Sequence, residues 1–261
     1  MYQIILFIIL FFSFNYAEML RPANEAQLSH IHILFEWGQV PNAIQYEVQV
    51  SETEAFENLI INITTNELLH IAYEHFDWNQ TYHWKIRPYY GDGTYGDWLS
   101  SYYFTVHTAK LNQIDVDIVD SDAVQDGLII FGNIWQEQYP FSAAYDENGK
   151  EIWNDDNLMM LNHINQYGQM YGHTWIDWPN RTGLHINFRN EVLWQGPEGI
   201  TIDIHEIKQI PNGNYMAFVP EERLGPIPLG EWTNMFRALG YEADGETLEF
   251  PWIGQKIVEF D

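Results

Sequence analysis

A histidine and two carboxylates, Asp203, His205 and Glu206, lie within four residues of one another. Neutral imidazole is a good nucleophile near pH 7 and a fair leaving group, and carboxylates accept hydrogen bonds and protons. The trio therefore has the residue types for nucleophilic or acid–base chemistry. The structural alternative is that these polar groups start a strand and hydrogen-bond to neighbouring strands.

The segment around the trio predicts two strands joined by a tight turn. Pro211 presets φ for a turn, and Gly213 readily takes the positive φ that such a turn needs. Apolar and polar residues alternate before the turn, which predicts a strand with Asp203, His205 and Ile207 on one face. This hairpin is the element that must position the trio.

Composition excludes several functions. Aromatic residues make up 16% of the 261 residues. The chain contains no cysteine, so disulfides, thiolate metal sites and cysteine nucleophiles are excluded. Eleven Lys and Arg against 37 Asp and Glu give a net charge of −26, which excludes nucleic-acid binding through a basic surface. An anionic membrane surface would repel the chain as well. An anionic substrate would need a local donor-rich pocket.

The N-terminus predicts export. An uninterrupted apolar run at residues 4–12 is too short to span a bilayer comfortably and is typical of a signal peptide. We expect residues 1–17 to be this peptide and the protein to be secreted or periplasmic. A buried strand or a membrane anchor is the alternative.

Residues 18–108 show about seven short strands separated by turns, a pattern typical of a β-sandwich. The segments Phe35-Glu-Trp37, residues 43–51 and Thr81-Tyr82-His-Trp-Lys-Ile-Arg87 resemble a fibronectin type III module. The resemblance implies that Trp37 is a core residue and that Tyr82 makes a corner hydrogen bond. It also implies a spacer or interaction module rather than an active site.

Residues 109–261 show a different pattern. Asn148-Gly149 predicts a hairpin turn, and Trp153 and Trp194 end two similar units 41 residues apart. Such spacing with short strands predicts the first blades of a β-propeller. The whole chain is therefore predicted to be all-β. Because about 150 residues are too few to close a propeller, we expect the chain to be a fragment whose open blade edges self-associate.

The motifs Asp146-x-x-Gly-x-x-x-Trp153 and His205-Glu-x-x-x-Ile-Pro-Asn-Gly-Asn214 together resemble the arylsulfotransferase family of exported propeller enzymes. The resemblance covers roughly residues 126–261. Many family members have a second histidine where this chain has Ile204, and an aspartate where it has Glu206.

The resemblance implies transfer of a sulfuryl group from an aryl sulfate donor to a phenol acceptor through a sulfohistidine. It implies no cofactor and no nucleotide sulfate. His205 would be a channel histidine that contacts the sulfuryl oxygens, supported by Asp203 and Glu206. The nucleophile is expected in a later blade, outside this chain. The alternative is a non-catalytic secreted protein that binds glycans or proteins.

Other residues carry weaker signals. Arg181 and Arg189 have the charge to bind an anion, but surface turns are the favoured interpretation. His163, His173 and His185 lack the spacing of local zinc pairs and are interpreted as structural or surface residues. No metal site is predicted, although two acidic runs were considered for calcium, at residues 155–157 and 115–120. The segment Asn62-Ile-Thr64 is a glycosylation sequon.

Overall fold

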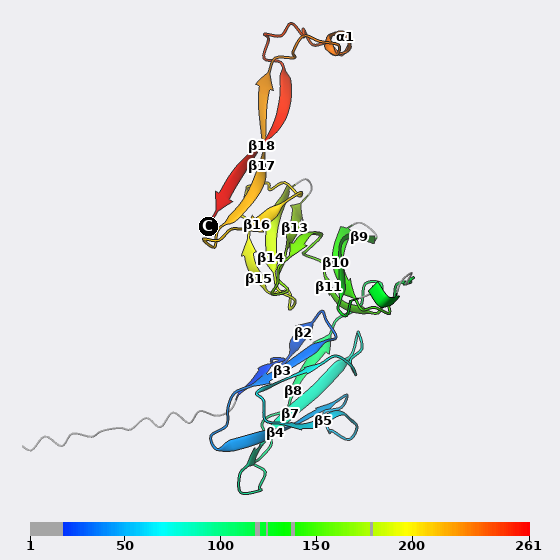
Figure 1. Cartoon of the computed structure of the whole chain (residues 1–261), viewed down its shortest axis with the longest axis vertical. Helices are drawn as coiled ribbons and strands as arrows, with labels where there is room; N and C mark the ends of the chain where they lie inside the picture. The colour runs from blue at the N-terminus through cyan, green and yellow to red at the C-terminus, as the bar shows by residue number, and fades with distance from the viewer. Residues whose placement is uncertain (1–17, 118–120, 124, 137–138, 178–179) are drawn as a thin grey trace, which may run out of the picture. The chain divides into compact units, whose positions relative to one another are not determined.

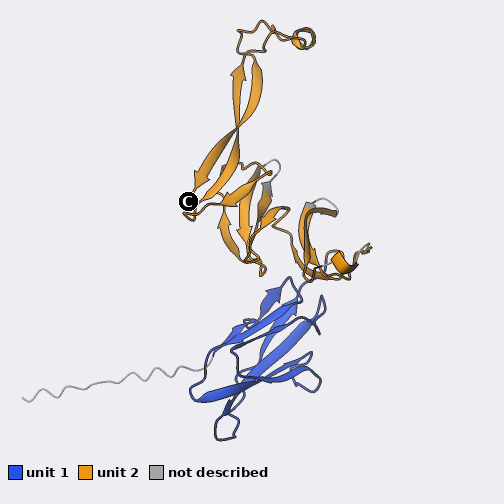
Figure 2. Ribbon diagram, in the orientation of Figure 1, with its two compact units in different colours: residues 1–109 blue, residues 110–261 orange. Residues whose placement is uncertain are grey.

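The computed structural model describes residues 18–117, 121–123, 125–136, 139–177 and 180–261. The predicted signal peptide lies outside these residues. The regular secondary structure of the described chain is almost entirely β-strand, which confirms the all-β prediction. It divides into two compact units, residues 1–109 and 110–261 (Figure 2). Among the described residues, no helix has the length and apolar character needed to cross a membrane.

The first unit is built from two β-sheets. One has three strands in the order β1-β3-β6, and the other has five in the order β2-β8-β7-β4-β5. All pairings are antiparallel except that of β2 with β8. The strands are β1 (Met19–Arg21), β2 (Ala26–Leu28), β3 (Ile33–Trp37), β4 (Ala43–Ser51), β5 (Leu59–Thr65), β6 (Leu69–Ala72), β7 (Thr81–Tyr90) and β8 (Tyr102–Val106).

The core of this unit follows the two-residue period of its strands. The apolar residues that alternate along β4 and β7 are buried: Tyr46, Val48 and Val50 in the first strand, and Tyr82, Trp84 and Ile86 in the second. Trp37 is only 1% exposed and packs against Tyr46, with ring centroids 5.7 Å apart. Phe35 lies among aromatic rings from three other segments.

Tyr82 makes the corner hydrogen bond that the sequence resemblance implies. Its side chain is buried, and its hydroxyl accepts a hydrogen bond of 2.9 Å from the backbone N–H of Asp77, five residues upstream. A tyrosine that bonds back in this way is typical of immunoglobulin-like sandwiches. The bond fixes the approach to β7.

The second unit contains three antiparallel sheets, of three, four and three strands. They follow one another along the chain in the orders β11-β10-β9, β12-β13-β14-β15 and β16-β17-β18 (Figure 1). The strands are β9 (Ile129–Gln136), β10 (Tyr139–Tyr145), β11 (Glu151–Asp155), β12 (Met160–Ile164), β13 (Met170–Asp177), β14 (Asn180–Ile186), β15 (Val192–Gln195), β16 (Ile207–Gln209), β17 (Tyr215–Gly225) and β18 (Phe250–Phe260).

Strands β17 and β18 form a long two-stranded ribbon (Figure 1). They pair over eleven residues, from Tyr215 opposite Phe260 to Gly225 opposite Phe250. The connection at the far end contains α1 (Thr233–Ala238), and a single 3₁₀ turn, η1 (Ser121–Ala123), precedes β9. The described residues do not form a closed propeller or barrel.

Two segments differ from what their sequence predicts: apolar and acidic residues alternate at residues 114–120, which predicts a strand with one solvated face, and the apolar run at residues 127–132 predicts a buried strand. Residues 114–117 form no strand, and residues 118–120 lie outside the described residues. Residues 127–132 were expected to be a buried strand, but Ile129 and Phe131 in β9 are 51% and 44% exposed. Leu128 and Ile130 pack against the core on one face, whereas Ile129 and Phe131 lie on the other face and stay in contact with solvent.

The predicted turn at Asn148-Gly149 is confirmed. Gly149 has a φ of 79° and donates a hydrogen bond of 3.0 Å to the carbonyl of Asp146. The side chain of Asp146 accepts from the backbone N–H of Asn148 and of Lys150, both at 2.9 Å. The turn sets the register of β10 and β11, in which Tyr145 lies opposite Glu151.

Truncation of Trp37 tests the core of the first unit. Because the ring is fully buried, we expect Trp37→Ala to lower the free energy of unfolding by about 3–5 kcal/mol. Urea unfolding of the whole chain, followed by tryptophan fluorescence, measures this. The control Tyr73→Ala removes a ring that is 63% exposed and should change stability by no more than about 0.5 kcal/mol. Equal effects would contradict the core assignment.

Candidate functional site

The predicted hairpin exists, but the trio precedes its first strand instead of lying in it. β16 begins at Ile207, and residues 204–205 form a turn. The Asp203 side chain causes this, because Oδ1 accepts a hydrogen bond of 3.0 Å from the backbone N–H of His205. Such local bonds offer the backbone an alternative to a strand. The prediction that Asp203, His205 and Ile207 share a strand face is therefore wrong.

Asp203 and His205 nevertheless form a pair. Oδ1 of Asp203 also bonds to Nδ1 of His205, and Oδ2 accepts a hydrogen bond of 2.9 Å from Nε2 of Gln255 in β18. The carboxylate is buried, whereas the imidazole is 78% exposed. With Nδ1 bound to the carboxylate, the ring presents its Nε2 edge to solvent.

These contacts set the charge state of Asp203. Burial alone would raise the pKa of its carboxyl, but the hydrogen bonds from His205 and Gln255 outweigh burial and hold the pKa below its usual value. The group is thus a carboxylate at neutral pH. Glu206 is exposed, and no hydrogen bond or ion pair joins it to His205 within the described part of the chain.

The face of β13 and β14 next to this pair carries buried polar side chains. His173 of β13 lies opposite Gly183 of β14. Two residues further along, Trp175 of β13 lies opposite Arg181 of β14. A Cβ on Gly183 would come within 2.4 Å of Ile207, so the glycine lets β16 approach this face closely. Arg181 was predicted in a surface turn, but it lies on a strand.

His173 is electrostatically linked to the trio. Burial lowers the pKa of His173 to about 4, because the imidazolium loses its hydration. The Asp203 carboxylate opposes this shift, whereas the positive charges of Arg181 and His205 add to it. The structure therefore brings together four groups from β13, β14 and the turn before β16. The sequence pattern did not indicate that two of these groups, His173 and Arg181, lie near the trio.

Several polar atoms of this cluster lack partners. Both ring nitrogens of His173 and Nε of Arg181 are buried and have no hydrogen bond of standard geometry to any described residue. The backbone of Asp203 interacts with the His173 ring, but without that geometry. Unpaired buried donors and acceptors cost about 1–3 kcal/mol each. Such a group is satisfied when a water or a ligand binds beside it.

A stack of aromatic and histidine rings lies on the same face. His163 and Tyr171 stack at 4.4 Å, and Tyr171 stacks on His185 at 4.0 Å. Nδ1 of His185 is 2.7 Å from the hydroxyl of Tyr215, which in turn stacks on Trp194 at 4.0 Å. Burial lowers the pKa of His185 to about 4, so it is neutral. These rings fix the four-stranded sheet against β16–β18.

Two other predicted candidates have structural contacts. Arg189 is in the turn between β14 and β15 and forms an exposed ion pair with Glu191. Asp155, considered as a calcium ligand, is buried and accepts hydrogen bonds from the backbone N–H of Asn157 and of Leu158. Burial raises the pKa of Asp155 to about 6. Among the described residues, no three His, Asp or Glu side chains are grouped to hold a metal ion.

Comparison with known proteins gives little further guidance. Neither the protein-family models nor the curated proteins include a match to the chain. Among solved structures, the chain has a similarity to the α-L-rhamnosidase of Streptomyces avermitilis complexed with L-rhamnose. The identity is 10% and the TM-score 0.29, and the match covers 63% of this chain but only 16% of the rhamnosidase.

The pKa of His173 predicts how stability depends on pH. In the unfolded chain the imidazole has its usual pKa of about 6.5, so between about pH 6.5 and pH 4 the unfolded state binds more protons than the folded state. Stability should therefore fall as pH decreases through this window. The limiting slope is about 1.4 kcal/mol per pH unit for each such histidine.

Substitution by phenylalanine isolates this contribution. We expect urea unfolding at pH 7.5 and pH 5.0 to show a smaller loss of stability for His173→Phe than for the parent chain. His107→Gln replaces an exposed histidine and should leave the pH dependence unchanged. If His173→Phe behaves like the parent chain, His173 is not buried as a neutral imidazole.

Proposed function

We propose that this chain belongs to an exported arylsulfotransferase-like protein, in which the cluster around His205 contacts the sulfuryl group of an aryl sulfate. The observation that carries the proposal is the pairing of His205 with the buried Asp203 carboxylate beside His173 and Arg181. In the same proposal, the three sheets of the second unit are successive blades of a propeller.

The arrangement fits recognition of a sulfuryl group. Asp203 holds Nδ1 of His205, so the free edge of the ring is oriented toward a ligand. Arg181 supplies a permanent positive charge and a donor without a partner among the described residues. Donors fixed in this way stabilise negative charge that grows on oxygen atoms in the transition state.

The proposed reaction has two displacement steps at sulfur. A histidine elsewhere in the protein attacks the sulfur of the donor, an N–S bond forms, and the S–O bond to the departing phenolate breaks. The phenol acceptor then loses its proton and attacks the same sulfur, and the N–S bond breaks. In both steps His205 acts as the imidazolium, with Nδ1–H on the Asp203 carboxylate and Nε2–H donating a hydrogen bond to a sulfuryl oxygen, and it is not the nucleophile.

Removal of the imidazole tests this role. In the product of the complete gene, we expect His205→Ala to lower turnover of 4-nitrophenyl sulfate with a phenol acceptor by about 10²–10³. A slow sulfohistidine should still form, and mass spectrometry of the quenched protein detects it. His107→Ala is the matched control at an exposed histidine.

The outcomes separate the alternatives. Complete loss of the covalent intermediate in His205→Ala would make His205 the nucleophile. An unchanged rate would return the residue to a structural role. Binding of the aryl sulfate without any turnover in the parent protein would support the alternative of a non-catalytic binding protein.

The outer edge of the last sheet supports a second part of the proposal, self-association. β18 is an edge strand of eleven residues, and Ile253 and Ile257 on it are 75% and 66% exposed. Long apolar edges of this kind pair with other chains. We expect the chain to self-associate at micromolar concentration and the double variant Ile253→Lys, Ile257→Lys to remain monomeric. Sedimentation velocity measures both, and a monomeric parent chain would contradict the proposal.

A further inference from the structure

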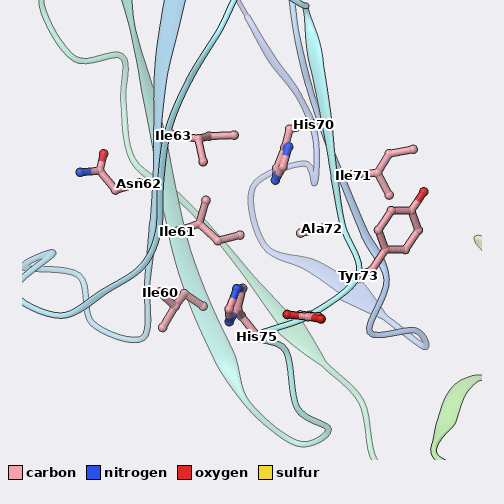
Figure 3. Close-up of a pocket in the computed structure, with 10 residues that line it drawn as sticks. Ile60, Ile61, Asn62, Ile63, His70, Ile71, Ala72, Tyr73 and His75 are labelled. Atoms are coloured by element: carbon pink, nitrogen blue, oxygen red, sulfur yellow. The ribbon is translucent and has the colours of Figure 1, made fainter. Parts of the chain in front are cut away.

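The first unit has a groove where the open edges of its two sheets face each other. β5 is the last strand of the five-stranded sheet, and β6 is the last strand of the three-stranded sheet. Between them lies a groove of about 380 Å³. Figure 3 shows Ile61 and Ile63 of β5 directed across the groove toward His70 of β6.

The groove combines apolar side chains with open backbone edges. No other described strand pairs with the outer edge of β5 or of β6, so backbone groups along both edges are available for pairing. The lining is mostly apolar: Ile61 and Ile63 of β5 point into the groove, whereas the side chains of Ile71 and Tyr73, which are 42% and 63% exposed, point away from it (Figure 3). An extended peptide suits such a site, because it pairs with the edge through its backbone and places alternate side chains in the groove.

The charge of the unit determines the kind of peptide. Residues 18–109 contain twelve carboxylate side chains and only three cationic ones. The three cations have partners inside the unit: Arg21 pairs with Glu36, Arg87 pairs with Glu47, and Lys85 lies 3.9 Å from the ring centre of Phe56.

The surface around the groove is therefore acidic. Glu74 lines the groove itself, and Glu67 lies in the exposed loop between β5 and β6. A negative field of this kind favours a partner that carries Lys or Arg beside its apolar residues, and it disfavours an acidic one.

We propose that this groove binds an extended, basic segment of a partner protein, which adds as a strand to β5. β5 is the favoured edge because it has seven residues, against four in β6, and so offers more backbone groups. The apolar side chains of the segment would pack on Ile61 and Ile63, and its cationic side chains would face Glu74.

A designed peptide tests the proposal on the whole chain. The probe is the acetylated and amidated heptapeptide Lys-Val-Lys-Val-Lys-Val-Lys, and the protein is produced without glycosylation because Asn62 lines the groove. We expect saturable binding, with NMR shifts at the amides of β5 and slower hydrogen exchange there. The same peptide N-methylated at its three valines has the same charge but lacks donors along one edge. It should bind at least about tenfold more weakly.

Paired variants locate the site. Ile63→Ser removes an apolar side chain that points into the groove and should weaken binding severalfold. Ile44→Ser removes one that is 54% exposed on β4, outside the groove, and should have no effect. Glu74→Lys should weaken binding of the cationic peptide more than Glu54→Lys does.

Three results would overturn the proposal. Equal affinity for the N-methylated peptide would show charge attraction without strand pairing. Equal effects of Ile63→Ser and Ile44→Ser would show adsorption on the acidic surface at large. Self-association that Ile63→Ser abolishes would show that a second copy occupies the groove. None of these results depends on sulfuryl transfer, because the variants and readouts lie in the first unit.

Discussion

The buried carboxylate of Asp203 is the constraint on which the candidate site depends. The backbone N–H of Asp203 donates to the carbonyl of Phe218 in β17, and the carboxylate binds His205 and Gln255. One residue thus ties the turn before β16 to both other strands of the last sheet. Without these bonds, a buried charge would lack compensation, and the turn that exposes His205 would lose its anchor. The position of the imidazole is therefore a consequence of satisfying this carboxylate.

Local signals in the sequence predicted the local structure well. Pro211 and Gly213 specify a turn through their own backbone preferences, and the structure has it, with Gly213 at a φ of 94°. Strand alternation likewise predicted the buried faces of β4 and β7. The prediction of a strand around His205 was wrong for an equally local reason. The Asp203 side chain competes for the backbone N–H groups, and apolar–polar alternation carries no information about that competition.

The rest of the site was not predictable from spacing. His173 and Arg181 come from neighbouring strands, and their proximity to Asp203 depends on how β16 packs against β13 and β14. Gly183 was the one residue in the sequence that could have indicated this packing. A glycine inside a strand often marks a close approach of another segment, and here it admits Ile207. That signal gives the presence of a neighbour but does not identify which segment approaches.

The two units meet the same electrostatic constraint in different ways. With a net charge of −26, the chain has few cations, and each one placed in a pair is unavailable for ligands. In the first unit all three are used internally, which leaves an acidic surface suited to a basic partner. In the second unit, Arg181 is held beside a histidine that burial keeps neutral. A neutral imidazole still donates a hydrogen bond to an anion, and its burial strengthens the field of the one fixed charge beside it. So acidic a protein has no exposed basic surface for an anion within its described residues, and the anion recognition proposed above therefore rests on this cluster.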